Sequence, residues 1–324
     1  MRHLKKCRIF FVYTMKKTLN LYSEYLREKF GQRIQKIPIY SGATCPNRDG
    51  SKGYGGCTFC NNDAFMPTYT RIEPTLTEQL NKGMTFFREK YETNLFIAYF
   101  QSYTSTFTAI EHFKNQVYEC LQHQDIKGIT IGTRPDCMPD ELLEFLTEIS
   151  KKTYLCIEYG AESIYENCLK TTNRCHTWQE SVETITKTAE KGIETGVHLI
   201  FGLPEEPENI AIETAETISK LPIYLLKLHQ LQILKGTTMG HHFLKKENAI
   251  KTMTLDEYIK ITTTFLEHLN PSILIDRLST ESPVDMVLAP HWGGVRHYEV
   301  KHKIESELKR RNSWQGKFWN NHSQ

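Results

Sequence analysis

The chain has 324 residues, of which 39% are hydrophobic and 24% charged, and its formal net charge at pH 7 is +2. This composition excludes a disordered or fibrous protein, and a chain of this length can bury a large core without disulfides. Nine cysteines in 324 residues are too dilute for a disulfide scaffold, so they indicate reduced thiols or ligands in a cytoplasmic protein. No segment reaches the roughly 18 apolar residues that a membrane-spanning helix needs, so we expect no membrane partner.

The first segment, residues 1–17, is predicted to be a basic extension ahead of the fold. Residues 1–23 hold six lysines and arginines and no acidic residue, and the apolar run Ile9–Tyr13 is too short for a signal peptide. Met15 is therefore an alternative start to Met1. Residues 301–324 hold six basic and two acidic residues, so the two ends carry +6 and +4 and the rest of the chain −8. Basic ends on an acidic body suit a polyanionic partner, although solvated tails explain them equally well.

Seven short apolar runs along the chain are the predicted strands. None of them alternates strictly between apolar and polar residues, which is typical of strands covered on both faces. The runs are Lys36–Tyr40, Leu95–Phe100, Gly128–Thr133, Tyr154–Tyr159, Val197–Phe201, Tyr224–Leu231 and Ile273–Leu278.

Amphipathic helices are predicted between these strands. Thr75 and Thr254, each followed three residues later by a glutamate, are capping boxes that begin two of them, and Gly192 suits a helix end. Strands that alternate with helices indicate parallel βαβ units. The chain is thus α/β, either a whole or partial barrel or a doubly wound sheet, with its active face at the loops after the strands.

The loop after the first predicted strand holds three cysteines, Cys45, Cys57 and Cys60, among five glycines that allow tight folding. A structural zinc site needs four protein ligands, and no histidine lies nearby to complete one. Three thiols suit a 4Fe–4S cluster in which one iron stays free of protein. Zinc completed by a distant cysteine or histidine, and a redox disulfide between Cys57 and Cys60, are the alternatives.

With this loop, the chain resembles the radical S-adenosylmethionine (SAM) superfamily. It resembles more closely an uncharacterised bacterial family within it, which has the spacing Cys-x11-Cys-x2-Cys in place of the usual Cys-x3-Cys-x2-Cys, and which is related to the coproporphyrinogen-oxidase-like and Elongator-like branches. The resemblance covers roughly residues 18–318. The motifs that carry it are Cys45–Gly50, Tyr99–Thr106, Gly132–Pro135, Arg277-Leu278 and Leu308–Gly316.

The resemblance implies a partial (β/α)6 TIM-like barrel over residues 18–270, with the cluster loop at 43–61. A C-terminal extension over residues 271–324 would supply a strand, a helix and a basic, aromatic tail. The cofactors implied are a 4Fe–4S cluster and SAM, whose amino and carboxylate groups chelate the free iron. A reduced cluster then cleaves the sulfonium to a radical that abstracts hydrogen from the substrate. Flavodoxin or ferredoxin is the implied electron donor.

The SAM contacts implied by the resemblance lie at strand ends. Gln101 and Ser102 follow the second strand, where the superfamily often binds the methionine amino group. Arg174 would hold the methionine carboxylate with its planar fork, and Glu162 the ribose or the amino group. A solvated charge at a helix end is the alternative for Arg174.

Three further positions are candidate cofactor contacts. Gly202 would let the backbone approach the adenine, and His198 lies where the related branch carries a ribose-binding aspartate. A satisfied core histidine is the alternative for His198. Glu158 is either a ribose acceptor or a barrel carboxylate paired with Lys227.

The catalytic residues are unknown, with Cys137, as a thiyl relay, and Arg277, in the substrate pocket, as candidates. For Cys137 a small packed thiol is the alternative. The basic, aromatic ending 309–319 suits phosphates and unpaired bases, or else it is a tail that covers the bottom of the barrel. The family is suspected in tRNA modification at the wobble uridine, so tRNA is the expected partner. A small-metabolite enzyme and a non-enzymatic zinc- or cluster-stabilised RNA-binding protein are the alternatives.

Overall fold

The structure is a computed structural model that describes residues 17–247 and 250–319. The predicted basic extension, apart from Lys17, and the alternative start at Met15 lie outside the described residues. Within the described ranges, every helix is too short or too polar to span a bilayer.

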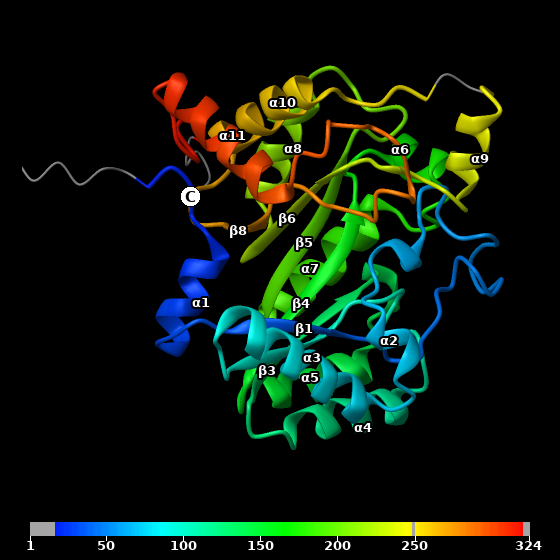
Figure 1. Cartoon of the computed structure of the whole chain (residues 1–324), viewed down its shortest axis with the longest axis vertical. Coiled ribbons are helices and arrows are strands. Elements are labelled where there is room, and N and C mark those ends of the chain that lie inside the picture. The colour runs from blue at the N-terminus through cyan, green and yellow to red at the C-terminus, as the bar shows by residue number, and fades with distance from the viewer. Residues whose placement is uncertain (1–16, 248–249, 320–324) are drawn as a thin grey trace, which may run out of the picture.

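A curled sheet of seven parallel strands forms the centre of the molecule (Figure 1). This partial TIM-like barrel confirms the predicted α/β fold, and each predicted apolar run overlaps one of its strands. The order in the sheet is β1-β2-β3-β4-β5-β6-β8. Because all of these strands are parallel, their carboxyl ends lie at one edge of the sheet. The strands are β1 (Gln35–Ile39), β2 (Phe96–Phe100), β3 (Ile126–Thr133), β4 (Tyr154–Glu162), β5 (Glu194–Phe201), β6 (Leu225–Gln230) and β8 (Leu274–Arg277).

Helices pack their apolar faces against the outside of this sheet. The capping boxes predicted at Thr75 and Thr254 are both present, and Gly192 has a φ of 77° just after a helix, as predicted. The helices are α1 (Tyr22–Phe30), α2 (Tyr69–Ile72), α3 (Leu76–Tyr91), α4 (Ile110–Leu121), α5 (Asp140–Ser150), α6 (Glu166–Thr171), α7 (Trp178–Glu190), α8 (Ile210–Ser219), α9 (Thr238–Leu244), α10 (Leu255–His268) and α11 (His297–Arg310), with 3-10 turns η1 (Asn62–Ala64) and η2 (Pro135–Cys137).

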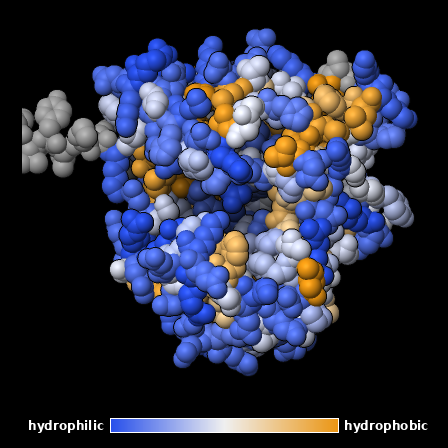
Figure 2. Space-filling model, viewed as in Figure 1, coloured by the Kyte–Doolittle hydropathy of each residue, from blue (hydrophilic) through white to orange (hydrophobic). Residues whose placement is uncertain are grey.

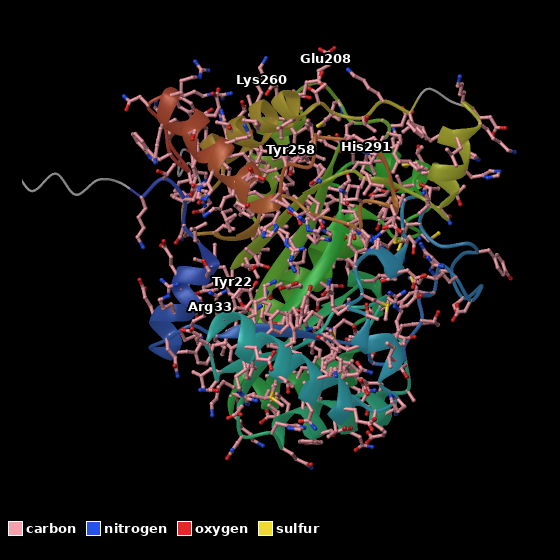
Figure 3. All side chains as sticks on the ribbon, viewed as in Figure 1. Tyr22, Arg33, Glu208, Tyr258, Lys260 and His291 are labelled. Carbon is pink, nitrogen blue, oxygen red and sulfur yellow. The ribbon has the colours of Figure 1, made fainter. Side chains whose placement is uncertain are left out.

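Two buried tyrosines, labelled in Figure 3, join helices to the sheet. The hydroxyl of Tyr22 in α1 bonds to the hydroxyl of Tyr154 at the start of β4. The hydroxyl of Tyr258 in α10 donates to the carbonyl of Leu278, just after β8. These bonds satisfy polar atoms that the core would otherwise leave unpaired.

The last described residues pack onto the amino end of the barrel. The backbone N–H of Gly316 donates to the carbonyl of Leu266 in α10, and that of Phe318 to the carbonyl of Glu267. The side chain of Gln315 donates to the carbonyl of Ile273, just before β8. A short antiparallel pair, β7 (Ile233–Leu234) and β9 (Val287–Ala289), lies apart from the main sheet.

Candidate functional site

A cavity of about 210 Å³ lies where the carboxyl ends of the strands meet the loop that follows β1. Figure 2 shows the molecule hollowed near the centre of the viewed face, with mostly hydrophilic residues around the hollow. Nine of the twelve predicted site residues line the cavity. They are Cys45, Cys57, Cys60, Gln101, Glu158, Glu162, Arg174, His198 and Arg277.

The other three predicted residues do not line this cavity. Ser102 is buried, and its carbonyl accepts a bond from Ser105. Gly202 lines a second cleft, where its N–H donates to the carboxylate of Glu206 over 2.7 Å. The buried thiol of Cys137 lies 3.8 Å from a carboxylate oxygen of Asp136.

The cysteine loop folds back on itself and onto the segment after α6. Gly55 and Gly56 have φ values of 76° and 81°, which side chains rarely adopt, so glycine permits the turn before Cys57. The side chain of Asn173 donates to the carbonyl of Gly56 over 2.9 Å, and the N–H of Thr58 donates to the carbonyl of Thr172 over 3.0 Å. The loop is therefore held by hydrogen bonds to its main-chain atoms on both sides of Cys57.

Polar side chains surround the thiols. The Nδ2 of Asn47 lies 3.5 Å from the sulfur of Cys57, and that of Asn62 lies 3.4 Å from the sulfur of Cys60. Burial and the nearby Cys57 raise the pKa of the Cys60 thiol to about 12, so without a metal this thiol stays protonated. The eight described cysteines are all free, and among the described residues no three side chains are placed as ligands of a single metal ion.

Arg174 connects the cysteine loop to the end of β4. Its Nη1 lies 3.5 Å from the sulfur of Cys57, and its Nη2 lies 3.4 Å from Oε1 of Glu162 and donates to the carbonyl of Gly160. A Cβ on residue 160 would lie 2.7 Å from the Glu162 oxygen and 2.8 Å from Arg174 Nη2. Glycine at this position therefore lets the two side chains meet.

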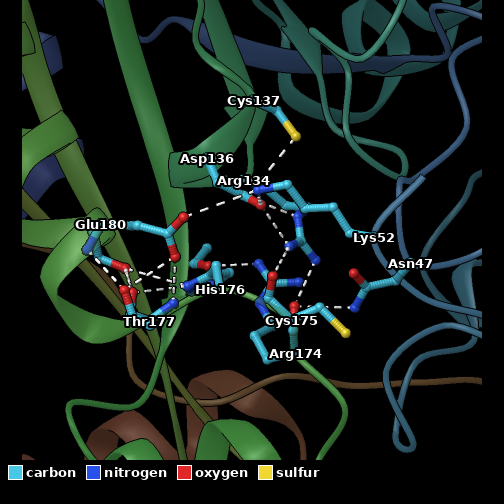
Figure 4. A network of polar contacts seen from close by, with 12 residues as sticks. Asn47, Lys52, Arg134, Asp136, Cys137, Arg174, Cys175, His176, Thr177 and Glu180 are labelled. Atoms are coloured by element: carbon cyan, nitrogen blue, oxygen red, sulfur yellow. Dashed lines mark hydrogen bonds and ion pairs between the residues drawn. The ribbon is translucent and has the colours of Figure 1, made fainter.

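A buried ion-pair network holds the backbone of Arg174 (Figure 4). Arg134, 1% exposed, donates to both carboxylate oxygens of Asp136 over 2.9 Å and to the carbonyl of Arg174 over 2.8 Å. That carbonyl also accepts from Asn47 over 3.0 Å, and Lys52 lies 2.6 Å from Asp136. Burial would raise the pKa of Asp136, but Arg134 and Lys52 hold it well below its usual range. The network joins the cysteine loop, the end of β3 and the segment after α6.

The floor of the cavity is a second buried ion-pair cluster. Glu158 bonds through Oε1 to Lys36 over 2.7 Å, and through Oε2 to Lys227 and to the hydroxyl of Tyr99. Burial would raise the pKa of Glu158, but the two lysines hold it well below its usual range. Asp276, 3.2 Å from Lys36, joins β8 to β1. The predicted pairing of Glu158 with Lys227 is thus present, and both of its oxygens have partners.

Several polar atoms of the cavity wall are buried and make no hydrogen bond within the described part of the chain: Arg174 Nε, His198 Nε2, His229 Nε2 and Thr280 Oγ1. Buried polar atoms normally have partners, so these indicate a polar ligand. Three thiols on the cavity wall are also a donor set that an iron–sulfur cluster takes. The residues present therefore fit a cluster with a polar molecule beside it.

Backbone strain also gathers around the cavity. Tyr103, Glu162, Asn173 and Cys175 have φ values of 57°, 67°, 54° and 57°, although none is glycine. Such conformations persist where the surrounding structure over-determines them, often at functional sites. Tyr103 lies two residues after Gln101, and because the sequence has no glycine there, Tyr103 itself adopts the positive φ. Its N–H donates to the side chain of Asn62 over 3.0 Å.

Comparisons with known proteins agree with this geometry. Residues 40–218 match the radical SAM superfamily, and residues 223–310 match the radical SAM C-terminal domain. The chain is 34% identical to the uncharacterized protein YtqA of Bacillus subtilis over 295 residues, which cover 91% of each protein.

Two further similarities are to Elongator complex protein 3 and to an archaeal Elp3. Elongator complex protein 3 of Bos taurus is 27% identical over 61% of this chain, which spans only 36% of that protein. The structure of the archaeal Methanocaldococcus infernus Elp3 with an N-terminal deletion matches with a TM-score of 0.64 and 13% identity, over 87% of this chain and 64% of that one. The second similarity is one of fold.

Proposed function

The chain belongs to the radical SAM superfamily, and on this premise we propose that its cavity binds a 4Fe–4S cluster and SAM side by side. It is an enzyme of that superfamily. We assign the cluster to Cys45, Cys57 and Cys60, which leaves one iron open for SAM. The observation that carries this assignment is that all three cysteines line one cavity with Arg174, whose guanidinium lies 3.5 Å from the Cys57 sulfur.

We assign the methionine end of SAM to the residues beside the cluster. The guanidinium of Arg174 binds the methionine carboxylate, since a planar guanidinium can donate to both carboxylate oxygens. Glu162 accepts from the amino group or the ribose, and Gln101 lines the same wall. Glu158 supports this site from below, because its oxygens already bond to Lys36, Tyr99 and Lys227. When bound, the cluster supplies the electron for SAM cleavage.

We propose His198 for the ribose side of the cofactor. Its Nδ1 lies 3.3 Å from Oε2 of Glu162, and its Nε2 has no partner among the described residues. Gly202 and Ser102 do not line this cavity, so we assign them no contact with the ligand. Cys137 does not line the cavity, so we assign it no role as a relay.

We further propose that the substrate is a tRNA, modified at an anticodon uridine. The similarity to Elongator complex protein 3 supports this proposal, as does the basic end of the chain. On α11, Lys303 and Lys309 are exposed and available to phosphates. A flavodoxin or ferredoxin would supply the electron. A small metabolite is the second candidate for the substrate.

Anaerobic reconstitution with iron and sulfide tests the assignment. The reduced protein, given SAM, is expected to bind about four irons and to release 5′-deoxyadenosine slowly. Cys57→Ala should lose both the iron and the release, while the melting temperature changes little. Cys120→Ala is the matched control, since this buried thiol lies on α4 away from the cavity. Stoichiometric zinc without iron, or equal losses in both variants, would rule the assignment out.

A further inference from the structure

A chain of polar contacts crosses the cavity from the cysteine loop to β6. It passes from Cys57 to Arg174 over 3.5 Å, to Glu162 over 3.4 Å and to His198 over 3.3 Å. The ring of His198 then meets the ring of His229 edge-on, with 4.2 Å between centroids. In this series of contacts, the residues from Cys57 to His198 are the proposed cofactor contacts. His229, at the other end, has no role in the proposed function.

Two groups at this far end are unsatisfied. His229 Nε2 and Thr280 Oγ1 are buried and make no hydrogen bond to any described residue. Both residues line the cavity, and Thr280 is 6% exposed. A buried polar atom without a partner is destabilising, so two on one wall indicate a ligand with an uncharged hydrogen-bonding edge.

The wall that carries these groups is fixed in place. The side chain of Gln230, next to His229, donates to the carbonyl of Thr280 over 2.9 Å, and its oxygen accepts from the N–H of Thr280 over 3.1 Å. These two bonds tie the end of β6 to the segment after β8. The subsite is therefore preorganised, which lowers the entropy lost on binding.

Charge is distributed unevenly around the subsite. Burial lowers the pKa of both His198 and His229, and the Arg277 charge nearby lowers it further, so both imidazoles are neutral at pH 7. Arg277 itself lines the cavity and is exposed to solvent. Two uncharged, hydrogen-bonding imidazoles thus lie beside an exposed cation.

We infer that His229, Thr280 and Arg277 form a nucleotide subsite, in which His229 and Thr280 bind the edge of the base and Arg277 binds its phosphate. A nucleotide has the same division, with an uncharged heterocycle at one end and an anion at the other. Neutral imidazole and hydroxyl groups donate or accept as a base edge requires. This inference rests on the proposed function and names the residues that would receive the target nucleotide.

Binding of uridine and uridine 5′-monophosphate to the cluster-loaded, SAM-bound protein tests the subsite. Equilibrium dialysis should show the monophosphate binding at least tenfold more tightly than uridine. Arg277→Gln should remove this preference and leave uridine binding unchanged. His229→Ala should weaken both ligands about equally, and His229→Gln, which keeps a donor, should restore part of the affinity. The exposed His302→Ala and Arg27→Gln are matched controls and should bind as the parent does.

Other outcomes separate this inference from the proposed function. If a tRNA anticodon stem-loop binds and stimulates 5′-deoxyadenosine release while neither mononucleotide binds, the subsite is wrong and the tRNA proposal stands. If the mononucleotide pattern appears but tRNA does not bind, the subsite stands alone. A loss of SAM affinity in His229→Ala, measured by dialysis, would assign the residue to the cofactor and overturn the inference.

Discussion

Gly160 is the position where a single atom would disturb the proposed methionine site. Its missing side chain lets Arg174 reach its carbonyl and lets Glu162 approach Arg174. In Gly160→Ala the new Cβ would come within 2.8 Å of both side chains, so one of them has to move. We expect SAM to bind at least tenfold more weakly, equivalent to about 1.4 kcal/mol.

Equilibrium dialysis of SAM against the cluster-loaded variant measures this effect. Iron content should stay at the parent value, because the atoms nearest to the new Cβ belong to Glu162 and Arg174 and not to the cysteines assigned to the cluster. Unchanged SAM affinity would mean that Arg174 does not hold the methionine carboxylate. A loss of iron would instead show that the residue supports the loop.

The site residues that the sequence did not predict show where pattern reasoning ends. His229 lies on β6, but the apolar run alone did not show that the strand face carrying it lines a cavity. Arg134 lines the cavity, and its guanidinium bonds to Asp136 and to the carbonyls of residues 174 and 175, which only the fold brings near.

At the scale of elements, the pair Arg134 and Asp136 is the junction of β3, the cysteine loop and the segment after α6. Removing one partner leaves a buried unpaired charge, which destabilises proteins by about 3–5 kcal/mol. We expect Arg134→Met and Asp136→Leu each to lower the free energy of unfolding by an amount in that range. The double variant should lose clearly less than the sum, since neither charge remains.

Urea denaturation of the four proteins gives this comparison. Arg311→Met, which breaks the pair with Glu267 at the other end of the molecule, is the control for losing a half-buried arginine. The control should leave iron loading unchanged, whereas Arg134→Met should reduce it, because Lys52 and Asn47 of the cysteine loop belong to the junction. Additive losses in the double variant would show that the pair does not act as a unit.

The loop between β5 and α8 carries a pH-sensitive group outside the cavity. Burial raises the pKa of Glu206 to about 8, although the N–H groups of Gly202 and Leu203 donate to its carboxylate over 2.7 and 3.0 Å. In the unfolded chain a glutamate ionises near pH 4.3. The folded protein therefore holds this proton more tightly, and its stability should fall as the pH rises from about 5 to 8.

This group alone contributes at most about 1.4 kcal/mol per pH unit in that window. Glu206→Gln cannot ionise, so its free energy of unfolding should fall less steeply from pH 5 to 8 than that of the parent. Denaturation midpoints at each pH unit measure both slopes. Parallel curves would show that Glu206 is charged in the folded protein.

At the scale of the whole molecule, the fold followed from short apolar runs because each strand of a parallel sheet is covered on both faces. The runs Leu95–Phe100 and Tyr154–Tyr159 became the buried β2 and β4. The curvature of the sheet, which brings its two edge strands close, was less predictable. The contact of Lys36 in β1 with Asp276 in β8 joins strands 240 residues apart, and no local pattern records it. The division at residue 270 stays a prediction, although β8 pairs with β6.

The distribution of charge gives the last prediction. If tRNA lies along the basic end of the chain, each lysine that contacts a phosphate displaces about 0.9 of a counterion, so affinity falls with salt. We expect Lys303→Gln combined with Lys309→Gln to weaken tRNA binding and to reduce the slope of log affinity against log salt by about two units.

Fluorescence anisotropy at several salt concentrations measures the slope. The matched pair Lys82→Gln and Lys90→Gln removes two exposed charges from α3, on the other side of the barrel, and should leave the slope unchanged. Equal slopes in all three proteins would place the tRNA elsewhere, because the phosphate contacts would not involve α11.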